Sequence, residues 1–194
     1  MAFAQVIQMP QIYPVFFREV SNNMYSATAF YLAAQVSILT TFIYYPIIIT
    51  VVSYWNFGLV DTSIHNFFEY LCCMVGMMLA GASIGFAFGT IFGDTLIAMK
   101  ILENLATLFQ FGGGMIVNVS RNANFTARFL SYTSPQRYGA ELLMRVVISG
   151  VEGKDAVLAF YGYTWGVTTC YILLLAFVMI CFSTGLFFIN RRAK

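Results

Sequence analysis

The chain has 194 residues, of which 60% are hydrophobic and only 9% are charged, and its net charge is +2. A soluble globular domain carries about 25% charged residues because its surface must be solvated. This composition therefore predicts an integral membrane protein in contact with lipid. So small a net charge, with no basic patch, gives no basis for nucleic-acid binding.

The N-terminal segment comes first in chain order and is apolar but short. Its first 17 residues are interrupted by Pro10 and Pro14 and contain several glutamines. A complete crossing needs about 20 apolar residues. This segment is therefore expected to be the end of a membrane span or an interfacial segment.

Four later stretches are long and apolar enough to cross a bilayer. They are expected at about residues 27–54, 67–88, 96–117 and 157–189. Since crossings of this kind are helical, the sequence predicts an all-α, polytopic transmembrane helical bundle. We treat residues 1–194 as a single transmembrane domain.

The connection at residues 118–155 differs from the crossings because charged residues are spread among its apolar ones. These charged residues include Arg121, Arg128, Arg137, Glu141 and Arg145. The pattern predicts a partly helical, amphipathic excursion on one membrane face. Lys and Arg residues divide equally between the two sides of a four-crossing topology, so charge alone leaves the orientation open.

Aromatic residues are expected at the membrane interface on the side of this excursion. Tyr54, Trp55, Tyr161, Tyr163 and Trp165 lie near the ends of predicted crossings. Tyr and Trp concentrate at the membrane–water interface, so these five residues predict an aromatic belt. Two sequons that begin at Asn118 and Asn124 would serve as glycosylation sites only if this face were luminal or extracellular.

Glycines recur every four residues along the second predicted crossing. Gly81, Gly85, Gly89 and Gly93 would line one helix face, and small residues on one face let a second backbone approach closely. The spacing predicts a helix-packing ridge, and static packing is favoured over a sliding or gating contact.

Residues that could carry chemistry are few. Lys100 and Glu103 are three residues apart at the start of a crossing, so pairing on one helix face is favoured over an ion pathway. His65 stands without a second ligand, so no metal site and no cofactor are expected. The run Gly112–Gly114 lacks the lysine of a phosphate-binding loop, and the chain contains no Walker A pattern. We expect no enzymatic activity, and no ATP hydrolysis by this chain alone.

Three segments together resemble the membrane domain of G-type (white family) ABC exporters. The first runs from Phe16-Phe17-Arg18-Glu19 through Asn23-Met24-Tyr25-Ser26, and the second is Tyr132-Thr133-Ser134-Pro135-Gln136-Arg137-Tyr138. Between them, Gly114-Met115-Ile116-Val117-Asn118 is similar to the end of the family's fifth span. The order and spacing also agree, and the resemblance covers residues 12–192.

The resemblance implies roles for several residues. Arg18, Glu19 and Tyr25 would belong to a cytosolic coupling segment that meets a nucleotide-binding domain. Met115 and Ile116 would form an apolar plug between the substrate cavity and an external cavity. The excursion would be an external cap, and both chain termini would be cytosolic.

The sequence also departs from the family. The family has an ATPase domain before its spans; we expect this domain and the first span to be missing, and the second span to survive only from Met1 to about Gln8. We therefore interpret the chain as a truncated membrane domain. Asn23 stands where the family has Gly.

Two functions follow from these features. The incomplete cavity favours an accessory or structural subunit of a larger membrane complex, for example an organellar energy-converting one. The alternative is the transmembrane half of a transporter that exports lipids or other hydrophobic compounds with a separate ABC ATPase. Both hypotheses imply membrane lipids and other membrane subunits as partners. The location would be an organellar membrane, such as the mitochondrial inner membrane, or the plasma membrane.

Overall fold

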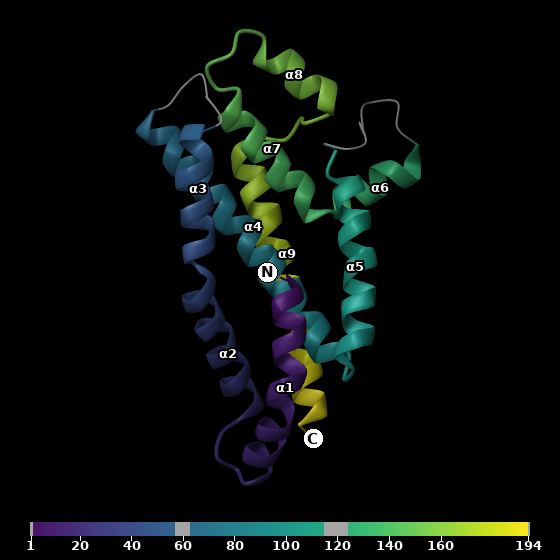
Figure 1. The fold of residues 1–194 in the computed structure, drawn as a ribbon. Coiled ribbons are helices and arrows are strands. Elements are labelled where there is room, and N and C mark those ends of the chain that lie inside the picture. Colours follow the sequence, from purple (N-terminus) through teal and green to yellow (C-terminus); the bar gives the residue numbers. More distant parts are fainter. Residues whose placement is uncertain (1, 57–62, 115–123, 194) are drawn as a thin grey trace. The chain divides into compact units, whose positions relative to one another are not determined.

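The computed structural model describes residues 2–56, 63–114 and 124–193, and all regular structure in these ranges is helical (Figure 1). The helices are α1 (Ala2–Ser21), α2 (Ala27–Phe42), α3 (Tyr44–Asn56), α4 (Ile64–Ile91), α5 (Thr95–Gly112), α6 (Phe125–Thr133), α7 (Pro135–Val147), α8 (Lys154–Tyr161) and α9 (Val167–Arg192). The predicted all-α fold is confirmed. Within the predicted excursion lie α6 and α7, which agrees with its partly helical pattern.

By length and composition, two helices in the described ranges could cross a membrane, namely α4 and α9. They have 28 and 26 residues and mean hydropathies of 2.0 and 2.7 over their best windows. Helix α5 has 18 residues and carries Lys100 and Glu103, both exposed. The predicted end of this crossing, residues 115–117, lies outside the described residues.

The first predicted crossing, residues 27–54, is wrong as a single helix. Helix α2 ends at Phe42, Ile43 forms a turn, and α3 begins at Tyr44. Pro46 is the third residue of α3. A proline ring clashes with the carbonyl four residues earlier and removes one helix hydrogen bond, so a new helix begins just before Pro46.

The last predicted crossing, residues 157–189, begins too early. Helix α8 is separate and ends at Tyr161, and α9 begins at Val167. Gly162 has a φ of 74° and its N–H bonds back to the carbonyl of Ala159 at 3.1 Å. This left-handed glycine ends α8, and the chain runs without helix to Gly166.

The N-terminal helix is longer than expected. Helix α1 does not end near Gln8 but continues through Pro10 and Pro14 to Ser21. One face, formed by Val6, Met9, Tyr13 and Phe16, is buried. This continuous buried face compensates for the hydrogen bonds that the two prolines remove.

The chain divides into two compact units. The first contains residues 1–43, 79–104 and 177–194. Its core brings together α1, α2, the second half of α4 and the end of α9 through buried residues of each: Met9, Tyr13, Phe16, Ala27, Tyr31, Phe86 and Ile189.

The second unit contains residues 44–78 and 105–176. Tyr54, Tyr70 and Val146 form one of its buried clusters. In the predicted aromatic belt, Trp55 is exposed, but Tyr54 is only 1% exposed and Tyr163 only 2%. Both buried tyrosines donate hydrogen bonds to backbone carbonyls, so they contribute to packing within this unit.

Candidate functional site

The segment that joins α1 to α2 has a tightly defined backbone. Two N–H groups close the end of α1: that of Asn23 bonds to the carbonyl of Val20 at 3.0 Å, and that of Met24 bonds to the carbonyl of Glu19 at 3.1 Å. This pair of bonds is a Schellman motif, which satisfies carbonyls that a helix end leaves without partners. The direction of the chain after α1 is therefore fixed.

Asn23 occupies the left-handed position that this motif requires. Its φ is 54°, and it is the only non-glycine residue with positive φ in the described ranges. Glycine adopts this conformation most readily, and asparagine is the side chain that tolerates it best. Asn23 therefore fits the backbone conformation of this turn.

Helix α2 begins with a side-chain cap. The Ser26 hydroxyl accepts a hydrogen bond from the N–H of Ala29 at 3.3 Å, and the Ser26 carbonyl accepts from the N–H of Phe30 at 3.1 Å. A serine at this position satisfies one of the first N–H groups of a helix. Hydrogen bonds thus hold the backbone on both sides of the turn.

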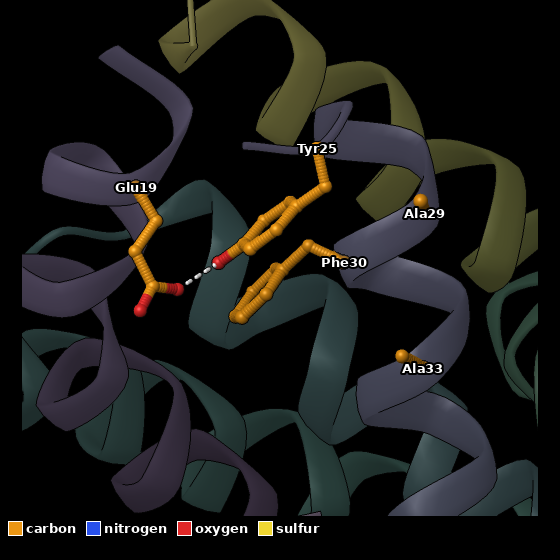
Figure 2. A pocket seen from close by; sticks show the side chains of 5 residues that line it. All are labelled: Glu19, Tyr25, Ala29, Phe30 and Ala33. Atoms are coloured by element: carbon orange, nitrogen blue, oxygen red, sulfur yellow. Dashed lines mark hydrogen bonds between the residues drawn. The ribbon is translucent and has the colours of Figure 1, made fainter. Parts of the chain in front are cut away.

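A side-chain hydrogen bond between Glu19 and Tyr25 links the two sides of the turn. The Tyr25 hydroxyl donates to Glu19 Oε2 at 2.6 Å. Figure 2 shows these two groups pointing toward one another, with the Phe30 ring beside the Tyr25 ring. The Tyr25 and Phe30 rings are stacked at 5.9 Å with an interplanar angle of 7°, and Phe30 also contacts Phe16 of α1 at 4.6 Å between ring centroids.

A shallow cavity of about 440 Å³ lies at this turn, lined by Glu19, Tyr25, Ala29, Phe30 and Ala33 (Figure 2). Desolvation of the ring, followed by the hydrogen bond and the negative charge of Glu19, raises the pKa of Tyr25 to about 12. The phenol therefore keeps its proton throughout the physiological range, and the bond to Glu19 persists.

The outer surface of the turn combines a cation with an apolar side chain. Arg18 is exposed, Met24 is 67% exposed and Phe17 is 39% exposed. A guanidinium beside apolar surface suits contact with another protein, because Arg and Met are enriched at interface cores. The structure thus gathers the predicted coupling residues in one hydrogen-bonded turn: Arg18, Glu19 and Tyr25.

The predicted glycine ridge lies mainly within α4. A Cβ on Gly85 would collide with the backbone of Ala2, and one on Gly89 would lie 2.9 Å from the Cβ of Met9. Helix α1 therefore approaches α4 closely at these two glycines. The Tyr13 hydroxyl also donates to the carbonyl of Gly89 at 2.6 Å.

The two ends of the ridge differ from its middle. Gly81 is half-buried in α4, whereas Gly93 lies beyond the end of α4. A Cβ on Gly93 would lie 3.3 Å from the Arg192 guanidinium, which donates to the carbonyl of Ile91 at 2.9 Å. At Gly93 the neighbour is therefore a cation at the end of α4, a favourable place for positive charge.

The predicted plug residues Met115 and Ile116 lie outside the described residues, as does Asn118. Sequence reasoning missed a group of charged side chains in α7. Arg137 and Glu141 are 3% and 0% exposed, although both had been assigned to an interfacial excursion. Their spacing of four residues, continued by Arg145, is the helical signal that could have identified a shared face.

The comparisons with known proteins bear on most of the chain. A family model described as "ABC-2 type transporter" matches residues 1–148. Protein scarlet of Drosophila melanogaster is 30% identical over 145 residues, which cover 74% of this chain and 21% of that protein. The ABC transporter ATP-binding protein/permease wht-1 of Caenorhabditis elegans is 30% identical over 133 residues, which cover 67% of this chain and 19% of that protein.

A plant protein gives a similar match. ABC transporter G family member 21 of Arabidopsis thaliana is 28% identical over 144 residues, which cover 74% of this chain and 21% of that protein. The chain thus spans about a fifth of the length of the curated relatives it matches. Because the family model covers most of the sequence and these relatives are G-type ABC transporters or similar to them in sequence, the chain belongs to the ABC-2 type transporter family and is a G-type membrane domain.

Proposed function

We propose that this chain is the transmembrane part of a G-type ABC transporter that exports lipids or other hydrophobic compounds. ATP hydrolysis would come from an ABC ATPase, carried by the same polypeptide or by a separate one. The sequence alone favoured an accessory subunit, but family membership supports the transporter reading better. The observation that carries the proposal is the hydrogen-bonded turn at residues 18–26, which lies where the resemblance implies a coupling segment.

The turn is built to transmit movement from an ATPase to the helices. A force on Arg18 or Met24 acts on a backbone held by the Schellman motif and by the bond between Glu19 and Tyr25. The Phe16–Phe30 contact ties the turn to both α1 and α2. Because these contacts restrict movement within the turn, displacement of the turn would move α1 and α2 together.

From the turn, movement would reach α4 through α1. Met9 packs against Gly89, and Tyr13 donates to the carbonyl of the same glycine. ATP binding to a partner ATPase would then favour one of two arrangements of these helices. The family resemblance implies that the turn and both termini would face the cytosol. Helices α6 to α8 would then face the external side.

The nucleotide part of the proposal is separately testable. We propose that the purified chain binds no ATP, because it has no phosphate-binding loop. Equilibrium binding of a fluorescent ATP analogue to the chain in lipid nanodiscs is expected to be indistinguishable from that of empty nanodiscs. Saturable binding that unlabelled ATP displaces would contradict this.

Transport itself is tested by reconstitution. The chain is purified in mild detergent, co-purifying ATPases are identified, and the complex is placed in vesicles with a fluorescent lipid. We expect ATP-dependent movement of the lipid, and loss of most of this movement in Arg18→Glu. Lys154→Gln, which removes an exposed cation from α8, serves as the control and should behave as wild type. Recovery of the chain in a large complex without any ABC ATPase would overturn the proposal.

A further inference from the structure

Helix α7 presents three charged side chains on one face, and that face is turned inward. Arg137, Glu141 and Arg145 are spaced four residues apart, so they lie one above the other. Glu141 is fully buried, Arg137 is 3% exposed and the Arg145 side chain is 27% exposed. Charges are rarely buried without a specific arrangement of partners, so the contacts of this face indicate its role.

Both arginines bind the short segment between α8 and α9. Arg137 donates to the carbonyl of Gly162 at 2.7 Å and also to the Ser131 hydroxyl. Arg145 donates to the carbonyl of Trp165 at 2.5 Å and to Glu141 Oε1 at 2.8 Å. Residues 162–165 are therefore held at both ends by cations of α7.

Between these two points, the same segment binds the end of α5. Tyr163 is 2% exposed, and its hydroxyl donates to the carbonyl of Gly113 at 3.0 Å. Its ring also lies against Gly114, where an added Cβ would be 3.3 Å from the ring. The arginines of α7 thus position, through Tyr163, the residues that close α5.

Some polar atoms on the charged face of α7 lack hydrogen-bond partners in this arrangement. Glu141 Oε2, Arg137 Nε and Arg145 Nε are buried and have no hydrogen-bond partner among the described residues. No carboxylate in the described ranges lies within ion-pair distance of Arg137. Unpaired buried groups of this kind are costly, and Glu141 has an arginine one turn away on either side.

We propose that Arg137, Glu141 and Arg145 form a clasp that holds residues 162–165, and with them the end of α5, in a closed position. Glu141 keeps Arg145 in place, and the clasp releases when Glu141 exchanges Arg145 for Arg137. A gating role for the clasp in export rests on the proposed function. The clasp lies entirely within the second compact unit, so its opening can be measured without an ATPase or a substrate.

A native cysteine reports the release. Cys170 lies in the first turns of α9, directly after the clasped segment, and is fully buried. The full-length chain in lipid nanodiscs is treated with N-ethylmaleimide, and the modification rate of each cysteine is followed by peptide mass spectrometry. Exposed Cys72 gives the upper reference, and Cys181, which lies in the other unit, gives an internal control.

Arg145→Gln leaves Glu141 without its partner, so we expect Cys170 to react about tenfold faster or more, with Cys181 unchanged. Tyr163→Phe keeps the ring and loses only the hydroxyl, so a rise of a few fold is expected. Arg145→Lys should return the rate toward wild type because it restores a cation beside Glu141. Lys154→Gln removes an exposed cation nearby and serves as the matched control. Its Cys170 modification rate should stay within twofold of the wild-type rate.

Two results would overturn the clasp. One is an unchanged Cys170 rate in both Arg145→Gln and Tyr163→Phe when both elute as single sharp peaks in size exclusion. The other is an equal rise in Lys154→Gln. If Arg145→Gln does not fold, the milder Tyr163→Phe decides, and its failure leaves the transport proposal unaffected.

Discussion

Asn23 shows how the residue type and the backbone conformation agree at one position of the turn. Its φ of 54° meets the requirement of the turn that follows α1. In the sequence, Asn23 stands where the resemblance leads one to expect Gly. Only backbone geometry shows that the position calls for left-handed conformation, which Asn shares with Gly.

Substitution of Asn23 should separate conformation from side-chain contacts. We expect Asn23→Gly to be neutral or slightly stabilising, because glycine adopts positive φ without strain. Asn23→Ala should lower the free energy of unfolding by about 1 kcal/mol, since a Cβ without a compensating polar group is disfavoured there. Thermal unfolding in detergent measures both. Equal unfolding temperatures for the two variants would show that the turn does not need this conformation.

Tyr25 provides a pH-dependent prediction. The pKa of its phenol is raised to about 12 in the folded protein, so its contribution to stability is complete below pH 10 and is lost as the pH rises through about 12. Tyr25→Phe keeps the stacked ring but removes the bond to Glu19. We expect this substitution to lower the free energy of unfolding by about 1 kcal/mol at pH 7, a value already reduced for the partial exposure of Tyr25. A loss that is undiminished at pH 12 would contradict this assignment.

At the scale of helices, hydropathy located the apolar segments but not their interruptions. Residues 27–54 read as one crossing because no charge interrupts them, whereas Pro46 forces a new helix at Tyr44. Gly162 likewise separates α8 from α9. Such breaks depend on one residue each, and averages over a window of about 20 residues hide them.

Helix α4 offers a matched pair of glycines. A Cβ on Gly85 would collide with the backbone of Ala2, but one on Gly76 would meet only a Leu174 side-chain atom at an ordinary 3.8 Å. We expect Gly85→Ala to destabilise the protein by about 1–3 kcal/mol through overpacking. Gly76→Ala should be neutral or stabilising by up to about 1 kcal/mol because alanine favours helix.

Chemical or thermal unfolding of the two variants in the same detergent tests this difference. If Gly85→Ala were as stable as Gly76→Ala, the close approach of α1 to α4 would be wrong. The sequence predicted a packing ridge from glycine spacing alone. It could not predict that the partner helix would be α1, because spacing on one helix carries no information about which helix approaches it.

At the scale of the whole molecule, composition and motif order were enough to predict a helical membrane protein of the G-type ABC family. The resemblance also drew attention to residues 18–26, which form the turn between α1 and α2 in the structure. The buried charges of α7 were not predicted as such, because charged residues in a connection between crossings normally face water. Their burial depends on contacts with Gly162 and Trp165, which are distant in sequence.

The central claim is that the turn at residues 18–26 meets an ABC ATPase. A photo-crosslinking amino acid placed at position 18, in membranes of the native host, tests it directly when the crosslinked peptides are sequenced by mass spectrometry. The same probe at position 154, on α8, serves as the control. We predict that position 18, but not position 154, is joined to peptides of an ABC ATPase domain. Crosslinks from position 18 only to lipid or to unrelated membrane subunits would contradict the account.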